Sequence, residues 1–208
     1  MGKWRLPSLA AIVLSIITGV AQPVSADSLF MISIDTRPLA GVNAQLAVDF
    51  IDGDGASNTV TLSGFSTDGT LGPATTIGDV SGSLPGTVTF TDASFFNELL
   101  QDILLGDSIA FILTLTQNFT GPTPDALSLF LFDPTTGLPL FTTTDPTGAN
   151  ALFAVDIDGT GFGNPQTFAS TGQPDATLTA TVPAPTTLVL LGTGLAVLGI
   201  RRRLNWKL

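Results

Sequence analysis

Residues 42–50 read VNAQLAVDF, and apolar side chains occupy every second position from Val42 to Phe50. Successive side chains of a strand point to opposite faces of a sheet, so these apolar residues share one face. The sequence Asp-Gly-Asp-Gly follows at 52–55, and such residues are typical of a tight turn. The stretch therefore predicts a half-buried β-strand that ends in a turn.

The same alternation recurs between Asp27 and Thr181, with clusters of Gly, Pro and Asp between the runs. The further strands that it predicts contain Phe30–Ile34, Val60–Leu62, Val88–Phe90, Ile109–Leu115, Leu127–Leu131, Leu152–Ala154 and Ala176–Thr181. About eight to ten short strands at this spacing indicate a β-sandwich. We therefore predict one all-β domain over 27–181, a jelly-roll-like β-sandwich.

One stretch of the domain departs from the strand pattern. Ser94–Leu105 reads SFFNELLQDILL, and Phe96, Leu99, Leu100 and Ile103 fall at helical spacing. We expect one short helix here, covering an open end of the sandwich.

The composition excludes several kinds of chemistry. The 208 residues include no Cys, no His and no Tyr, so disulfides, Cys or His metal sites and histidine-activated nucleophiles are ruled out. Between residues 27 and 182 the only basic residue is Arg37, against 17 acidic ones, which gives a net charge of 1 − 17 = −16. Such a polyanion is repelled by nucleic acid and by anionic membrane surfaces, and its natural ionic partners are cations such as Ca²⁺.

The amino-terminal end has the three parts of a secretory signal peptide. Lys3 and Arg5 precede an apolar run at 9–20, and small residues follow up to Ala26. We predict a signal helix within residues 1–26, export by the secretion translocon, and cleavage by signal peptidase between Ala26 and Asp27. A retained membrane anchor is the alternative, but 12 helical residues span only about 18 Å of a core of about 30 Å.

The carboxy-terminal end, residues 182–208, is also tripartite. It comprises Val182-Pro183-Ala184-Pro185, an uncharged apolar segment at 186–200, and Arg201-Arg202-Arg203. The arginines would stay in the cytoplasm and act as a stop, so the segment predicts a transmembrane helix with the acidic domain outside. The alternative is a buried core helix with a basic cap.

This tail resembles the PEP-CTERM sorting signal of Gram-negative bacteria. There, a Pro-Glu-Pro motif, a short transmembrane helix and an arginine cluster are recognised by a membrane transpeptidase, the exosortase. The resemblance implies that Pro183-Ala184-Pro185 is the recognition motif, with Ala184 in place of the glutamate. It also implies an exosortase partner and a precursor that is tethered in the inner membrane before it reaches the cell surface or the extracellular space.

Carboxylates near two turns are candidate ligands for Ca²⁺, which takes six to eight oxygen ligands. They are Asp49, Asp52 and Asp54 around the first turn, and Asp156 and Asp158 before a second Asp-Gly pair. The alternative is that these residues only form the turns.

These features favour a non-catalytic protein of the cell surface or the extracellular exopolysaccharide matrix, with no cofactor unless Ca²⁺ binds. A carbohydrate- or Ca²⁺-binding module is the alternative. The second alternative is a glycoside hydrolase that uses Asp156 and Asp158 as its two carboxylates. The domain has neither Trp nor Tyr, the usual side chains for stacking on sugars, and this weakens both carbohydrate readings.

Overall fold

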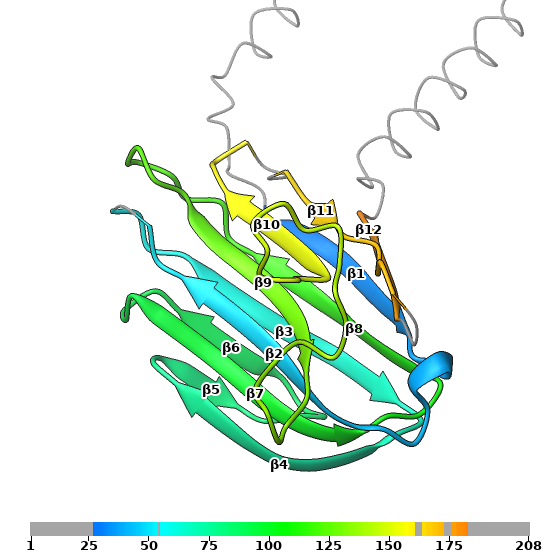
Figure 1. Cartoon of the computed structure of the whole chain (residues 1–208). Coiled ribbons are helices and arrows are strands. Elements are labelled where there is room, and N and C mark those ends of the chain that lie inside the picture. Colours follow the sequence, from blue (N-terminus) through cyan, green and yellow to red (C-terminus); the bar gives the residue numbers. More distant parts are fainter. Residues whose placement is uncertain (1–26, 54, 161–163, 173–175, 183–208) are drawn as a thin grey trace, which may run out of the picture.

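The structure is a computed structural model, and it describes residues 27–53, 55–160, 164–172 and 176–182. These residues form two antiparallel six-stranded sheets that pack face to face (Figure 1). Sheet A has the order β12 (Thr177–Thr181), β1 (Ser28–Asp35), β8 (Ser108–Leu115), β3 (Thr59–Thr67), β6 (Val88–Thr91), β5 (Val80–Gly82). Sheet B has the order β11 (Gln166–Thr167), β10 (Phe153–Ile157), β9 (Asp125–Phe132), β2 (Asn43–Ile51), β7 (Phe96–Leu104), β4 (Thr70–Ile77).

The strand pairing is nested, which confirms the predicted jelly-roll-like sandwich. β1 pairs with β8, β2 with β7 and β3 with β6, and consecutive strands from β1 to β4 alternate between the sheets. This concentric order is that of a jelly roll. The later strands widen it, because β9, β10 and β11 extend sheet B while β12 extends sheet A.

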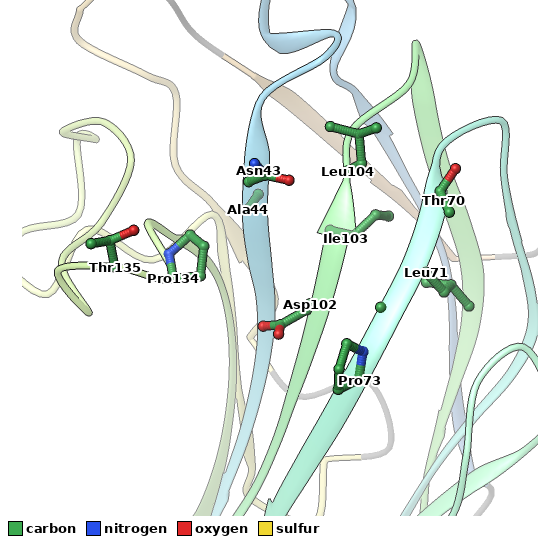
Figure 2. Close-up of a pocket in the computed structure, with 11 residues that line it drawn as sticks. Asn43, Ala44, Thr70, Leu71, Pro73, Asp102, Ile103, Leu104, Pro134 and Thr135 are labelled. Carbon is green, nitrogen blue, oxygen red and sulfur yellow. The ribbon is translucent and has the colours of Figure 1, made fainter.

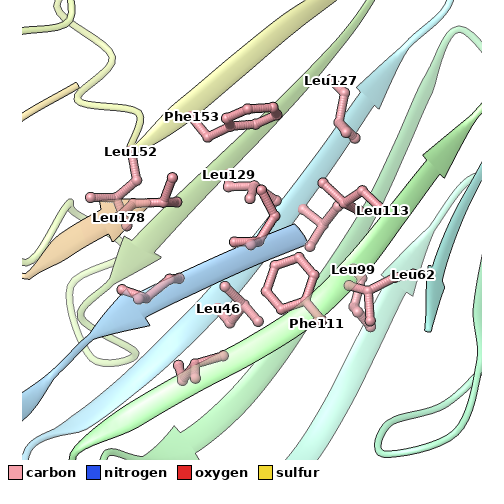
Figure 3. Close-up of a cluster of buried hydrophobic side chains, with 14 of the residues drawn as sticks. Leu46, Leu62, Leu99, Phe111, Leu113, Leu127, Leu129, Leu152, Phe153 and Leu178 are labelled. Atoms are coloured by element: carbon pink, nitrogen blue, oxygen red, sulfur yellow. The ribbon is translucent and has the colours of Figure 1, made fainter. Parts of the chain in front are cut away.

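The core lies between the two sheets and is built from the alternating apolar residues (Figure 3). In β2, for example, Leu46, Val48 and Phe50 are fully buried, as the sequence predicted. Phe30 of β1 meets Phe153 of β10 edge to face, with ring centroids 5.6 Å apart. Burying each such side chain is worth about 1.5–3 kcal/mol, so this layer is the main source of stability.

The predicted helix at Ser94–Leu105 is wrong, since Phe96–Leu104 forms strand β7, which lies between β2 and the edge strand β4 in sheet B. Its inward residues include the amides Asn97 and Gln101 beside Leu99 and Ile103. Because these two inward positions are polar, the sequence does not show the apolar residue at every second position that indicates a strand. The only helical element in the described residues is the 3₁₀ turn η1 (Arg37–Leu39).

The two buried amides serve the backbone of their neighbours. The Gln101 Nε2 donates to the carbonyl oxygens of Gly72 (2.9 Å) and Pro73 (3.2 Å), where the register of β4 shifts. The Asn97 Oδ1 accepts a bond of 2.7 Å from the Asp79 amide. Each amide thus satisfies polar backbone groups that an apolar side chain would leave without a partner.

Candidate functional site

The domain begins at one end of the sandwich, and β12 runs toward that end and stops opposite the middle of β1. β1 begins at Ser28, opposite Leu115, and β12 ends at Thr181, opposite Met31. The segments 55–58, 92–95 and 116–124 lie at this same end, because they flank β3, β6 and β8 where those strands pair with one another and with β1. We call it the tail end (Figure 1). The opposite end, which carries η1 and the β7–β8 turn, is the far end.

Three carboxylates meet at the tail end. Asp52 follows β2, Asp92 follows β6 and Asp125 begins β9, and one oxygen from each lies within 4.8 Å of the others. Asp125 is buried, whereas Asp52 and Asp92 are half-buried. The fold thus gathers three acidic groups from segments far apart in the sequence.

Asn58 holds this carboxylate cluster in place. Its Nδ2 donates a bond of 2.7 Å to the Asp125 Oδ2, and its backbone amide donates to the Asp92 Oδ2. Its own Oδ1 accepts bonds of 2.9 Å from the Asn118 amide and the Thr116 hydroxyl. Asn58 therefore ties Asp125 through its side chain, and Asp92 through its backbone amide, to the end of β8.

Gly53 is required at the entrance to the cluster. Its amide donates a bond of 2.8 Å to the Asp125 Oδ1. A Cβ atom at this position would collide with the carbonyl oxygens of Thr123 and Pro124. The close approach of these two backbone segments is what brings Asp52 to Asp125.

No basic side chain of the described residues balances the cluster. Arg37 is the one Lys or Arg among them, and its guanidinium binds Asp35 with an Nε–Oδ1 distance of 2.9 Å at the far end. Among the described residues, the three carboxylates of the cluster therefore have hydrogen-bond donors on one side but no basic side chain to neutralise them. Such an oxygen-rich set suits a hard divalent cation.

Of the predicted Ca²⁺ ligands, the structure brings only Asp52 into this cluster. Asp49 lies on β2 beside Glu98, Asp156 is exposed on β10, and Asp158 follows that strand. Asp54 lies outside the described residues. The Asp158 carboxylate accepts bonds from the Thr160 hydroxyl and amide, which lower its pKa, so it is a turn-forming acceptor and ill suited to donate a proton.

Sequence reasoning missed Asp92 and Asp125. Each stands alone at a strand end without a glycine or a second carboxylate beside it. The strand pairing joins them, since Thr59–Thr91 pairing fixes the end of β6 and Ile51–Ala126 pairing fixes the start of β9. Local spacing therefore offers no signal for either residue.

A second acidic feature is the carboxyl pair Asp49–Glu98 on the outer face of sheet B. The residues are direct cross-strand partners, and Ser128 lies opposite Asp49 on its other side. Burial, and then the charge of Glu98 and a hydrogen bond to it, raise the pKa of Asp49 to about 7. Burial also raises the pKa of Glu98. One proton is therefore retained by Asp49 through mildly acidic pH.

A pocket of about 400 Å³ lies at the far end of the outer face of sheet B (Figure 2). Asp102 is the one charged residue in its lining, and the Gln45 Nε2 binds that carboxylate at 2.8 Å. Asn43, Thr70 and Pro134 belong to the same lining, which contains no aromatic ring. The pocket therefore offers no platform on which a sugar could stack, and it contains none of the predicted site residues.

The predicted delivery segments fall outside the described residues, at 1–26 and 183–208. They contain the predicted cleavage residue Ala26, the predicted motif residues Pro183, Ala184 and Pro185, the helix predicted at 186–200 and the predicted stop residues Arg201, Arg202 and Arg203. Asp27 and Val182 are the described residues that adjoin them. Within the described ranges there is no helix with the length and hydropathy needed to cross a bilayer.

Comparison with known families identifies the carboxy-terminal segment. The PEP-CTERM protein-sorting motif matches residues 181–203, which span the end of β12, the Val-Pro-Ala-Pro sequence, the apolar segment and the arginines. Comparison with curated proteins and with solved structures gives no significant match. The motif marks an exported protein with a membrane-anchored precursor, as in Gram-negative bacteria, and it implies exosortase-dependent processing. The chain thus carries a PEP-CTERM protein-sorting motif over residues 181–203.

Proposed function

We propose that this protein is a non-catalytic component of the cell surface or the exopolysaccharide matrix, whose β-sandwich is the cargo of the sorting tail. The observation that carries the proposal is the sorting motif at 181–203, which begins on the last residue of β12. The tail follows the domain without an intervening domain, so whatever is sorted is the sandwich itself.

The side chains of the domain support a non-catalytic role. His, Cys and Tyr are missing from the whole sequence, and the domain contains no Lys. Carboxylates are therefore the acid–base groups of the domain. Asp156 and Asp158 are the two carboxylates that the hydrolase alternative requires. Asp156 is exposed on a strand, whereas the Asp158 carboxylate accepts a hydrogen bond from the Thr160 hydroxyl. A general acid needs a raised pKa, whereas the pKa of Asp158 is lowered.

Expression of the full chain with and without an exosortase-type transpeptidase tests the sorting. We expect a membrane-bound precursor without the transpeptidase, and a shorter form at the surface or in the medium with it. A chain in which Arg201, Arg202 and Arg203 are replaced by alanine is the control, because it lacks the cytoplasmic stop. Recovery of the unmodified chain in the cytosol under both conditions would refute the proposal.

The matrix role is tested by the partition of the mature form between cells and purified exopolysaccharide. Retention in the polysaccharide fraction, and release when that polysaccharide is enzymatically degraded, is the expected result. Release that does not depend on degradation would remove the polysaccharide as a partner.

A Ca²⁺-binding module is the second candidate, and the cluster of Asp52, Asp92 and Asp125 favours it. A ligand that binds only the native state raises the melting temperature. We expect Ca²⁺ to raise it, and Asp92→Asn to reduce that rise. Asp107→Asn, an exposed change at the far end, is the matched control and keeps the full effect. An equal rise in both variants, or no rise in the unmodified chain, would exclude this site.

A further inference from the structure

Each sheet leaves its outermost strands with one side unpaired among the described residues, and β4 is the longest of these edge strands (Figure 1). β5, β11 and β12 have three, two and five residues, whereas β4 has eight. In the described part of the chain β4 pairs with β7 alone, so alternate residues of β4 point their N–H and C=O groups away from the sheet. Such a row of groups is complementary to another extended strand.

The two halves of this edge differ. The first half contains Pro73, which has no N–H group, and the register with β7 shifts between Leu71 and Ala74. Proline and such irregularities are the devices by which natural edge strands avoid pairing with other chains. The second half, residues 74–77, pairs with β7 in regular register, contains neither proline nor a charged residue, and has all four side chains exposed. Residues 74–77 therefore form an open edge, which we call the edge segment.

We propose that the edge segment binds the same segment of a second copy of this chain in antiparallel orientation, so that sheet B continues from one copy into the other. Both copies use the same edge, so the pairing has two-fold symmetry and closes at a dimer. The inference goes beyond the proposed function and does not depend on the sorting tail.

The edge segment is complementary to itself. In an antiparallel pair, a residue whose backbone groups point outward faces a residue of the other strand whose groups also point outward. Because outward-pointing residues alternate, the two-fold axis must pass through one residue, and the central residues of the segment are Thr75 and Thr76. Either position places two threonines directly opposite each other, and such cross-strand pairs stabilise a sheet. The pairing also covers Ile77, which is 48% exposed.

The charge distribution allows two copies to meet at this edge. The domain is a polyanion, so two copies repel each other where carboxylates approach. β4 itself has no charged residue, and the carboxylates of the neighbouring strand β7 are Glu98 and Asp102. In the paired sheet the two β7 strands are three strand spacings apart, or about 14 Å. Repulsion over this distance is largely screened at physiological ionic strength, where the Debye length is about 8 Å.

The length of the edge segment indicates a weak dimer. Four residues from each copy bury much less than the roughly 800 Å² per partner of a standard stable interface. The dimer should therefore form mainly where the chains are concentrated, and a covalent trap is the suitable way to detect it.

Single cysteine residues provide this trap, because the chain contains no cysteine of its own. Full-length Thr75→Cys and Thr76→Cys variants in detergent micelles are oxidised with copper phenanthroline, and the disulfide-linked dimer is measured on non-reducing gels. At the two-fold axis the two Cα atoms lie about 4.5–5.5 Å apart, which a disulfide can span.

Two exposed threonines serve as matched controls. Thr70→Cys lies on the same strand, but its two copies would be at least about 30 Å apart in the dimer, at about 3.4 Å per residue. Thr179→Cys lies on β12, the edge strand on the opposite side of the sandwich.

We expect one of the two central positions to give several times more linked dimer than either control. Equal linking at all four positions would reveal random collision or association through another part of the chain, and would overturn the proposal. Absence of linking at both 75 and 76, or linking chiefly at 179, would also overturn it. Circular dichroism spectra that match the unmodified chain confirm that the variants are folded. Because none of these outcomes depends on export or processing, the proposed function is tested separately.

Discussion

Asp49 of β2 and Glu98 of β7 are direct cross-strand partners on the outer face of sheet B, so two like charges face each other across one ladder. Like charges placed directly opposite in a sheet are destabilising. The Asp49 Oδ1 is buried and accepts no hydrogen bond from the described residues. Retention of a proton relieves both costs, which agrees with the raised pKa of Asp49.

The first prediction concerns the pH dependence of stability. The unfolded chain releases this proton near pH 4, whereas the folded chain holds it to about pH 7. The free energy of unfolding should therefore decrease as pH rises from about 4 to 7. Asp49→Asn, which is neutral throughout, should remove most of this decrease and be more stable than the unmodified chain at pH 8 by about 1–3 kcal/mol.

Urea unfolding at pH 4, 6 and 8 measures this effect. Glu98→Gln serves as the companion variant and should flatten the profile less, because burial, the larger cause of the raised pKa of Asp49, remains. An Asp49→Asn profile that falls as steeply as that of the unmodified chain would show that another group is responsible.

Asp68 should make the free energy of unfolding depend on pH in the opposite direction to Asp49. Its carboxylate accepts bonds from the amides of Asp107 (3.0 Å) and Ser108 (2.9 Å), which lower its pKa. The stabilisation is present above about pH 4 and disappears as pH falls through the lowered value. We expect Asp68→Asn to lose less stability than the unmodified chain between pH 5 and 2, as measured by thermal unfolding. An identical loss would contradict this role.

The buried amide of Gln101 should be essential for the edge of sheet B. Gln101→Met keeps the volume but leaves the Gly72 and Pro73 carbonyl oxygens without their donor, which should cost about 1–3 kcal/mol of unfolding free energy. Gln45→Met is the matched control on the outer face, where water can replace the bond to Asp102, and should cost less than about 1 kcal/mol. Equal losses in the two variants would contradict the assignment.

The close approach at Gly53 gives a prediction for the carboxylate cluster. Gly53→Ala forces the new methyl group against the Thr123 and Pro124 carbonyl oxygens and should cost about 1–3 kcal/mol. Gly172→Ala, where nothing lies within 4 Å of the added atom, should be nearly neutral. Urea unfolding of both variants makes the comparison, and a Gly53→Ala variant as stable as Gly172→Ala would show that the two segments separate readily.

Much of the fold could be predicted because its strands bury one face and expose the other. β8 alternates throughout, β2 departs from alternation only at the buried Ala47, and both were predicted. β4 could not be predicted, since it is an edge strand with almost every side chain exposed and with Gly72 and Pro73 in it. β7 was mistaken for a helix because its inward amides hid the alternation.

The candidate site was less predictable than the fold. Asp52 was found because a turn of Asp and Gly draws attention to it, whereas Asp92 and Asp125 join it only through strand register. The raised pKa of Asp49 has the same origin, because Glu98 becomes its neighbour only when residues 96–104 are a strand. Contacts between distant segments have no local pattern.

The replacement of the motif glutamate by Ala184 gives a prediction about sorting. If the transpeptidase reads a carboxylate at this position, Ala184→Glu should increase the fraction of precursor that is processed. Ala184→Gln has nearly the same shape without the charge and should not. Pulse–chase labelling of the precursor gives the two fractions, and equal processing of all three chains would show that the prolines suffice.

Mass spectrometry of the two termini of the protein recovered from cells and medium tests the central claim most directly. Delivery and sorting predict a chain that starts at Asp27 and ends within or near Val182–Pro185, with the apolar segment and the arginines removed. An intact chain from Met1 to Leu208 in the soluble cytosolic fraction would contradict it.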